Sequence, residues 1–254
     1  MPTIMSIEEM REHEWVVSWS GGKDSTATII LCHKYGIPIK RIVYVRMMYD
    51  EKLPATLPIM TEFVDRAKEV FEGWGYPVDI IEGVQTAKDF INKVYFKSKY
   101  EYKNGKPYGV CAFCRATCKF TGVKSATVKK ALEGSNYCDM LGYACDEDER
   151  LDRLTDTKQS IMVTLGIKEK NTFSICESYN LLSPLYGLGF SRDGCWFCPN
   201  AAKAERAYIK ENYPELIEEI LWMIEMCGYD VSSIAHRNHW VDDYYKGILK
   251  QASE

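Results

Sequence analysis

The sequence predicts an α/β domain, with a parallel β-sheet flanked by helices, followed by a helical, cysteine-bearing C-terminal extension. Three observations lead to this fold class. Segments rich in β-forming residues alternate with helical patterns, a short apolar run enters a Gly-Gly turn, and helical patterns dominate from Pro199 onward. The 254 residues suffice for one such domain and a smaller appendage. We expect the domain to span residues 1–190 and the extension, packed on it, to span residues 191–254.

The beginning of the chain has a strand–helix–strand order. Residues 15–19 read Trp-Val-Val-Ser-Trp, an apolar run that is typical of a buried strand. A short helix is expected over residues 24–35, because Gly36 and Pro38 stop the helical pattern. Residues 41–47 are again rich in β-forming residues and predict the second strand.

The same alternation continues along the chain. A long amphipathic helix is expected over residues 57–72, where apolar side chains recur at helical spacing. Residues 78–81 and 137–144 are predicted as further strands. In the extension, an apolar stripe predicts a helix through Leu216, Ile217, Ile220, Leu221 and Ile224.

Composition limits the classes of function. Hydrophobic residues make up 46% and charged residues 27%, which is ordinary for a soluble globular protein. The net charge of −4 provides no global basic field, although the segment Lys93–Lys130 combines basic residues with Tyr and Phe. No apolar stretch approaches the roughly 20 residues of a membrane span, and the N-terminus lacks the pattern of a secretory signal. We therefore expect a cytoplasmic protein with no membrane partner.

The loop Ser20-Gly21-Gly22-Lys23-Asp24-Ser25 is the main candidate for function. Its two glycines allow the backbone to approach an anion closely, and its place between a strand and a helix aims backbone amides at one point. Lys23 adds a positive charge, the two serines add hydroxyl donors, and Asp24 either holds Mg²⁺ or caps the helix. The loop has neither the Walker A spacing nor the dinucleotide-binding fingerprint. A phosphate site is favoured over a turn that is merely capped.

This string resembles the PP-loop signature of the adenine nucleotide α-hydrolase-like superfamily, and the resemblance covers roughly residues 15–200. It implies a Rossmann-like, HUP-type fold and an adenine nucleotide held by its phosphates. The nucleotide-binding residues that it implies are Ser18, Ser20, Gly21, Gly22, Lys23, Asp24 and Ser25.

Residues 142–151 look like a segment of the PAPS-reductase branch of that superfamily. The family segment carries an arginine that faces the anion, whereas here Ala144 and Cys145 occupy its neighbourhood. The resemblance adds Gly142 and Arg150 to the nucleotide-binding set, with Arg153 as an alternative to Arg150. A solvated helix start with acidic residues explains the same segment equally well.

Ten cysteines are many for a cytoplasmic chain, and they suggest metal binding or redox chemistry before disulfides. Two Cys-x-x-Cys pairs, Cys111 with Cys114 and Cys195 with Cys198, supply four soft ligands. The alternatives are a structural zinc ion and a [4Fe–4S] cluster. Adenylyl-sulfate reductases are similar in layout and hold a [4Fe–4S] cluster, although their first pair consists of adjacent cysteines. We favour the cluster.

The remaining cysteines and two histidines have simpler interpretations. Cys118 either replaces one metal ligand or acts as a reactive thiol, and we include it with Lys23 and Asp24 among the catalytic candidates. A solvated loop or helix start is the simpler interpretation of His236 and His239. Four cysteines in apolar patterns are expected to be small core residues: Cys32, Cys138, Cys176 and Cys227.

Three functions are consistent with these features. The first, favoured by the resemblance, is a PAPS-reductase-like oxidoreductase that acts on adenylyl sulfate or PAPS and needs a thiol or electron-donor protein. The second is ATP-dependent adenylation of a nucleic acid, with Mg²⁺, followed by displacement of AMP by sulfur. The third is a metal-stapled nucleotide sensor without turnover. A homodimer is a further expectation.

Overall fold

The structure is a computed structural model that describes residues 4–89, 120–226 and 238–249. The chain forms two compact units, each assembled from stretches that are separate in the sequence. Unit 1 contains the described residues of Met1–Arg46, Pro58–Glu82 and Thr127–Gly187, and unit 2 contains those of Met47–Leu57, Gly83–Ala126 and Leu188–Glu254. The domain division expected at residue 190 stays a prediction.

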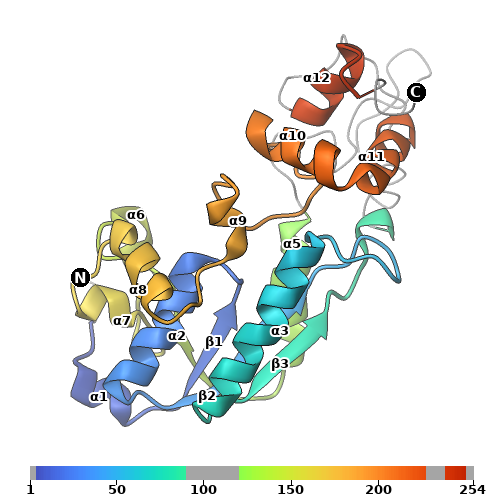
Figure 1. Ribbon diagram of the computed structural model, residues 1–254. Helices are drawn as coiled ribbons and strands as arrows, with labels where there is room; N and C mark the ends of the chain where they lie inside the picture. Colours follow the sequence, from blue (N-terminus) through green and yellow to red (C-terminus); the bar gives the residue numbers. More distant parts are fainter. Residues whose placement is uncertain (1–3, 90–119, 227–237, 250–254) are drawn as a thin grey trace. The chain divides into compact units, whose positions relative to one another are not determined.

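Unit 1 is built on a five-stranded parallel sheet, which confirms the predicted fold class (Figure 1). The strands lie in the order β3-β2-β1-β4-β5. Their bounds are β1 Trp15–Trp19, β2 Ile39–Arg46, β3 Val78–Glu82, β4 Cys138–Met140 and β5 Lys158–Gln159. The helical elements of this unit are α1 Ile7–Arg11, α2 Lys23–Tyr35, α3 Pro58–Gly73, α6 Asp148–Leu151, α7 Ile161–Thr164, η2 Glu169–Asn171, α8 Thr172–Ser178 and α9 Pro184–Gly187.

Side-chain alternation along the strands explains why helices cover both faces of the sheet. Successive residues of a strand point to opposite faces. On one face, the Trp19 ring lies against Tyr44 of β2 and against Phe63 and Phe71 of α3. On the other face, Val16 and Val43 form a buried cluster with Leu132, and Val128 packs against it from the end of α5 (Thr121–Ala131). Both faces of β1 therefore carry buried apolar side chains, as the predicted buried strand requires.

The fourth strand is shorter than the sequence suggests. A strand is expected over residues 137–144, but β4 ends at Met140. Beyond it, the chain comes so close to the phosphate loop that a Cβ atom on Gly142 would lie 3.1 Å from the Ser25 amide nitrogen. The backbone leaves the sheet to make this approach, which apolar composition alone does not reveal.

Unit 2 contains the C-terminal helices α10 Lys203–Asn212, α11 Pro214–Met226 and α12 His239–Tyr245. The stripe predicted through Leu216 and Ile220 is buried on α11, as expected. Trp196 is also buried, and its ring nitrogen donates to the Pro54 carbonyl oxygen at 3.0 Å. Among the described residues, no helix has both the length and the apolar character that a bilayer crossing requires.

Candidate functional site

The phosphate loop follows the carboxyl end of β1, where the strand order of the sheet reverses. β1 lies between β2 and β4. The chain runs from β1 through β2 to β3 on one side of β1, and it then crosses over to β4 and β5 on the other side. In open parallel sheets, ligands bind at the carboxyl ends of the strands where the order reverses in this way. The topology therefore puts residues 20–25 where a nucleotide site is expected.

The two glycines of the loop have distinct tasks. Gly21 adopts a φ of +85°, in the left-handed region, and a Cβ atom there would lie 3.2 Å from the Met60 side chain. Gly22 is the N-cap of α2 and has no side chain that could accept from the first amides of the helix. Gly22 thus provides no cap for the positive end of α2, which attracts an anion.

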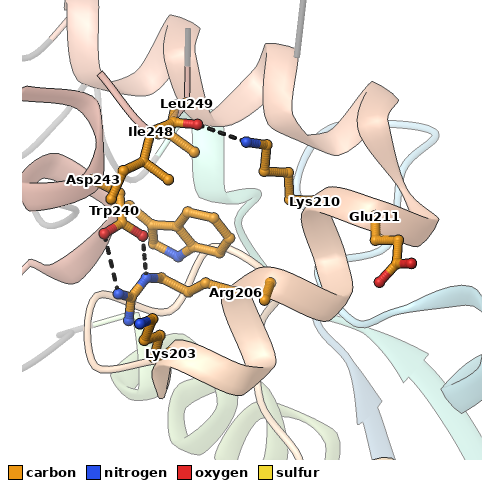
Figure 2. A pocket seen from close by; sticks show the side chains of 9 residues that line it. Lys203, Arg206, Lys210, Glu211, Trp240, Asp243, Ile248 and Leu249 are labelled. Carbon is orange, nitrogen blue, oxygen red and sulfur yellow. Dashed lines mark hydrogen bonds and ion pairs between the residues drawn. The ribbon is translucent and has the colours of Figure 1, made fainter. Parts of the chain in front are cut away.

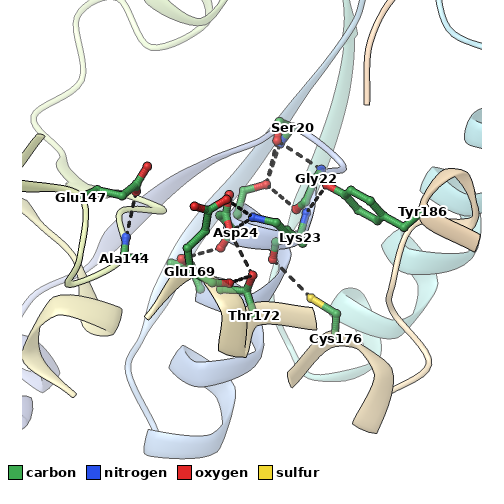
Figure 3. A network of polar contacts seen from close by, with 12 residues as sticks. Ser20, Gly22, Lys23, Asp24, Ala144, Glu147, Glu169, Thr172, Cys176 and Tyr186 are labelled. Carbon is green, nitrogen blue, oxygen red and sulfur yellow. Dashed lines mark hydrogen bonds and ion pairs between the residues drawn. The ribbon is translucent and has the colours of Figure 1, made fainter. Parts of the chain in front are cut away.

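The two serines hold the loop in shape. The Ser20 amide donates to the Ser25 hydroxyl oxygen at 3.1 Å, and the Gly22 amide donates to the Ser20 hydroxyl oxygen at 3.2 Å. The Ser25 hydroxyl donates in turn to the Gly22 carbonyl oxygen at 3.1 Å. These bonds link both ends of the loop, so the serines preorganise the backbone (Figure 3).

Lys23 is the buried cation of the site. Its side-chain nitrogen lies 2.8 Å from Asp24 and 2.8 Å from Glu169, as Figure 3 shows. Burial by itself would lower the pKa of this ammonium, but the hydrogen bonds to the two carboxylates outweigh it, and the pKa is raised. Lys23 is therefore charged at neutral pH, and its two partners compensate the charge.

A segment far along the chain forms the second wall of the site. The Asp146 carboxylate accepts from the Glu169 amide at 2.9 Å, which fixes η2 and turns Glu169 toward Lys23. The Thr172 hydroxyl donates to Asp24 at 3.0 Å. The Tyr186 hydroxyl, on α9, accepts from the Lys23 amide at 3.4 Å. Glu169 and Tyr186, which contact Lys23 directly, lie 146 and 163 positions away from it in the sequence.

The other expected nucleotide ligands differ in their placement. Gly142 lies against the loop, and its lack of a side chain permits the contact with Ser25. Ser18 is the exposed residue of β1. Arg150 forms an ion pair with Glu147 at 3.0 Å and lies over the Tyr143 ring. The roles of Ser18 and Arg150 as nucleotide ligands stay predictions.

The second cysteine pair lies in a tight turn of unit 2. The Cys198 amide donates to the Cys195 carbonyl oxygen at 2.9 Å, and both thiols are half-buried. The Arg192 guanidinium donates to the Cys198 sulfur at 3.2 Å. Burial lowers the pKa of the nearby Lys124, while Asp193 and Cys195 act in the opposite direction. Two soft ligands with a cationic neighbour are suited to bind a thiophilic metal.

The rest of the expected metal set lies outside the described residues, namely Cys111, Cys114 and Cys118. Within residues 4–89, 120–226 and 238–249, no group of three or more metal-ligating side chains is assembled. His239 begins α12 and pairs with Asp242, as expected of a helix start, whereas His236 is not described. The four-cysteine site therefore stays a prediction.

Two of the cysteines expected in the core are buried, namely Cys32 and Cys176. The Cys176 thiol donates to the Lys23 carbonyl oxygen at 3.2 Å, and burial raises the pKa of this thiol to about 12. Cys138 is half-buried, and Cys227 is outside the described residues. Cys176 thus braces the start of α2 as a neutral thiol and is not a nucleophile at neutral pH.

Comparison with known families identifies the fold of this site. The family model described as the tRNA methyl transferase HUP domain matches residues 13–160, which include β1, the phosphate loop and β4. The chain belongs to this family. The HUP domain supports the expected PP-loop superfamily but not its PAPS-reductase branch, and the ATP-dependent alternative fits better.

Two individual proteins resemble the chain. The uncharacterized protein MJ0973 of Methanocaldococcus jannaschii is 26% identical over 232 residues, which cover 88% of this chain and 50% of that protein. The chain thus spans half the length of this curated relative. Among solved structures, the U34-tRNA thiolase NcsA from Methanococcus maripaludis, with its [4Fe–4S] cluster, shares 13% identity at a TM-score of 0.41. That alignment covers 96% of this chain and 78% of NcsA.

Sequence reasoning recognised the HUP-domain loop but missed its second wall. Glu169, Thr172 and Tyr186 carry no motif, and no local spacing ties them to residues 20–25. Asp146 belongs to the segment 142–151, and its contact with the Glu169 amide depends on the fold. We see no sequence signal that would have identified these residues.

A separate cavity of about 350 Å³ lies in unit 2, between α10 and α12. Figure 2 shows the Trp240 ring between the Arg206 side chain and Ile248. Two cations that line this cavity have partners within the protein. The Arg206 guanidinium donates to the Asp243 carboxylate at 2.7 Å, and the Lys210 ammonium donates to the Ile248 carbonyl oxygen at 2.7 Å. We interpret these contacts as structural, because the bond between Arg206 and Asp243 joins α10 to α12.

Proposed function

We propose that this HUP-domain protein binds ATP and uses it to replace a carbonyl oxygen of an RNA base with sulfur. One observation carries the proposal: the N-terminus of α2, for which Gly22 provides no cap, and the buried cation Lys23 meet at the switch point of a parallel sheet. The description of the matched family names tRNA, which supports RNA as the substrate class.

The proposed reaction has two steps. First, the base carbonyl oxygen attacks the α-phosphorus of ATP, and pyrophosphate leaves. Second, a sulfur nucleophile of the sulfide class attacks the activated base carbon, and AMP leaves with the original oxygen. A proton is released with AMP, and no electron is gained or lost. The overall change is C=O to C=S at the cost of one ATP.

The loop residues have defined tasks in this scheme. The Lys23 ammonium and the first amides of α2 face the phosphates and stabilise the charge that develops on departing pyrophosphate. Asp24, whose carboxylate is held by Thr172, is the candidate for contact with the Mg²⁺ that accompanies ATP. Ser20 and Ser25 preserve the loop shape through their mutual bonds.

The cysteine pair of unit 2 fits a thiophilic metal group. Cys195 and Cys198 share one turn, and Arg192 donates to a sulfur, as donors around iron–sulfur clusters do. We propose that these residues, with Cys111 and Cys114, hold a [4Fe–4S] cluster, and that zinc is the alternative metal. When bound, the cluster would supply the sulfur-carrying site. Cys118 stays a candidate for a reactive thiol.

The test uses the full chain purified without oxygen. The protein is incubated with tRNA, ATP, Mg²⁺ and sodium sulfide, and the digested nucleosides are examined by mass spectrometry. We expect AMP release and a nucleoside whose mass corresponds to sulfur in place of oxygen, and neither in the Lys23→Ala variant.

Parallel reactions with adenylyl sulfate and PAPS, each supplied with dithiothreitol as the two-electron reductant, distinguish the proposal from its competitors. Sulfite release from either nucleotide, without thiolated RNA, would establish the reductase instead. Nucleotide binding without any turnover would favour the sensor.

A further inference from the structure

We infer that the Tyr186 hydroxyl and the Glu169 carboxylate occupy contacts that a nucleotide phosphate takes over, so that both residues lower nucleotide affinity until they are displaced. This inference rests on the proposed nucleotide site. It adds that two side chains of the protein compete with the nucleotide phosphates for that site. It concerns two residues that no motif identifies.

Tyr186 occupies the anion position of the loop. The backbone amide of Lys23 is the first of α2, and its acceptor is the Tyr186 hydroxyl at 3.4 Å. An oxygen atom therefore already lies where the positive end of α2 attracts a phosphate oxygen. The distance is longer than that of a typical N–H···O bond, so a phosphate oxygen would be a better acceptor.

Glu169 competes for the side chain of the same residue. The Lys23 nitrogen lies 2.8 Å from Glu169 and 2.8 Å from Asp24. Two carboxylates around one ammonium leave a local excess of negative charge, which repels a polyphosphate. The Lys23 ammonium can form its full ion pair with a phosphate only when one of the two carboxylates moves away.

The two carboxylates differ in how firmly they are held. The Asp24 side chain is 31% exposed and accepts a hydrogen bond from Thr172, whereas the Glu169 side chain is 55% exposed. We therefore expect Glu169 to rotate toward solvent on nucleotide binding while Asp24 remains in place.

The aromatic neighbour of Tyr186 indicates that its ring remains near the loop. The Phe173 ring meets the Tyr186 ring edge-on at 5.1 Å, and the Lys23 nitrogen lies 5.5 Å from the Phe173 ring centre. Figure 3 shows Tyr186 reaching the start of α2 from the side opposite Glu169. Removal of the hydroxyl alone thus deletes the competing acceptor and keeps the packing of the ring.

The experiment measures calorimetric binding of two probes, ATP with Mg²⁺ and inorganic pyrophosphate, to the full chain. We expect Tyr186→Phe to tighten binding of both probes by about two- to tenfold, which corresponds to loss of one competing hydrogen bond. Glu169→Gln should tighten both probes by a similar factor of about two to ten, because it removes one negative charge beside Lys23.

Two matched variants serve as controls. Tyr179→Phe makes the same chemical change on a tyrosine that contacts Trp74 instead of the loop, and Glu177→Gln removes an exposed acid of α8. Both should leave the affinities unchanged. Equal or weaker binding by Tyr186→Phe would overturn the inference, as would failure of the unaltered protein to bind either probe. The expected tightening without thiolated RNA would overturn only the proposed reaction.

Discussion

The phosphate loop of unit 1 and the cysteine turn of unit 2 place their binding groups in opposite ways. The loop relies on backbone amides and one lysine within residues 20–25, and its internal bonds join residues at most five positions apart. The cysteine turn offers two ligands, and a four-thiolate site needs residues about 80 positions away. A binding site made of backbone is local and recognisable, whereas one made of side chains from separate segments depends on the whole fold.

The largest effect is expected from Cys198→Ser. If four thiolates hold the metal group, loss of one should lower bound iron and sulfide by about tenfold or more. Nucleotide affinity should not change, because the loop lies in unit 1. Metal analysis and calorimetry on the same sample check both statements.

Cys138→Ser, a half-buried cysteine on β4, is the matched control and should retain the metal. Equal metal content in Cys198→Ser and the unaltered protein would remove the cysteine turn from the ligand set.

Lys23→Ala tests the phosphate loop, the other of the two regions compared above. We expect nucleotide binding to weaken by about 1–3 kcal/mol, the usual effect of losing a charge-assisted contact. The metal content should stay the same. Lys34→Ala, at the exposed C-terminal end of the same helix, is the control and should bind normally.

Unchanged affinity in Lys23→Ala would contradict the PP-loop assignment. Parallel loss of metal in this variant would show that the two regions are not independent.

Gly142→Ala tests whether the conformation of the phosphate loop depends on its contact with Gly142, which lies just beyond the end of β4. The added Cβ would lie 3.1 Å from the Ser25 amide nitrogen and 3.2 Å from the Asp24 carbonyl carbon, so the backbone must shift. We expect the free energy of unfolding to fall by about 1–3 kcal/mol, together with weaker nucleotide binding. Chemical denaturation and calorimetry measure the two effects.

Gly122→Ala, on α5, meets nothing within 4 Å and provides the control, with an expected neutral or slightly favourable effect on stability. If Gly142→Ala behaved in the same way, the contact between residue 142 and the loop would be unimportant.

The smallest effect is expected from Asp50→Asn, in the segment that supports the cysteine turn. Burial raises the pKa of Asp50, but bonds from the Lys52 and Leu53 amides and from Lys88 outweigh it, so the pKa is lowered. The carboxylate therefore stabilises the fold above its ordinary pKa, and this contribution is lost as the pH falls through the lowered pKa.

The substitution should lower the free energy of unfolding at pH 7 by under about 1 kcal/mol, and the difference should vanish in acid. Denaturation curves at several pH values measure it. Asp65→Asn, an exposed acid paired with Arg46, is the comparison variant. A difference that grew on acidification would contradict the sign of the pKa shift.

Much of the fold followed from pattern. β1, β2 and β3 and helices α2 and α3 lie within about two residues of their predicted bounds, because apolar periodicity and glycine stops are local signals. β4 is shorter than the predicted strand 137–144, and Gly142 beyond its end lies against the phosphate loop. The two-residue strand β5 escaped prediction because so short a segment has no period.

The sequence by itself determined the α/β class, the phosphate loop and the glycines and serines that shape it. These features depend on contacts between neighbours in the chain. Tertiary structure alone decided that Glu169 and Tyr186 face Lys23 and that Gly142 touches the loop. It also decided that Cys176 braces α2 as a buried thiol. The physical reason is that parallel strands bring their carboxyl ends to one edge of the sheet. Residues distant in sequence meet at this edge, and no local sequence pattern predicts their contacts.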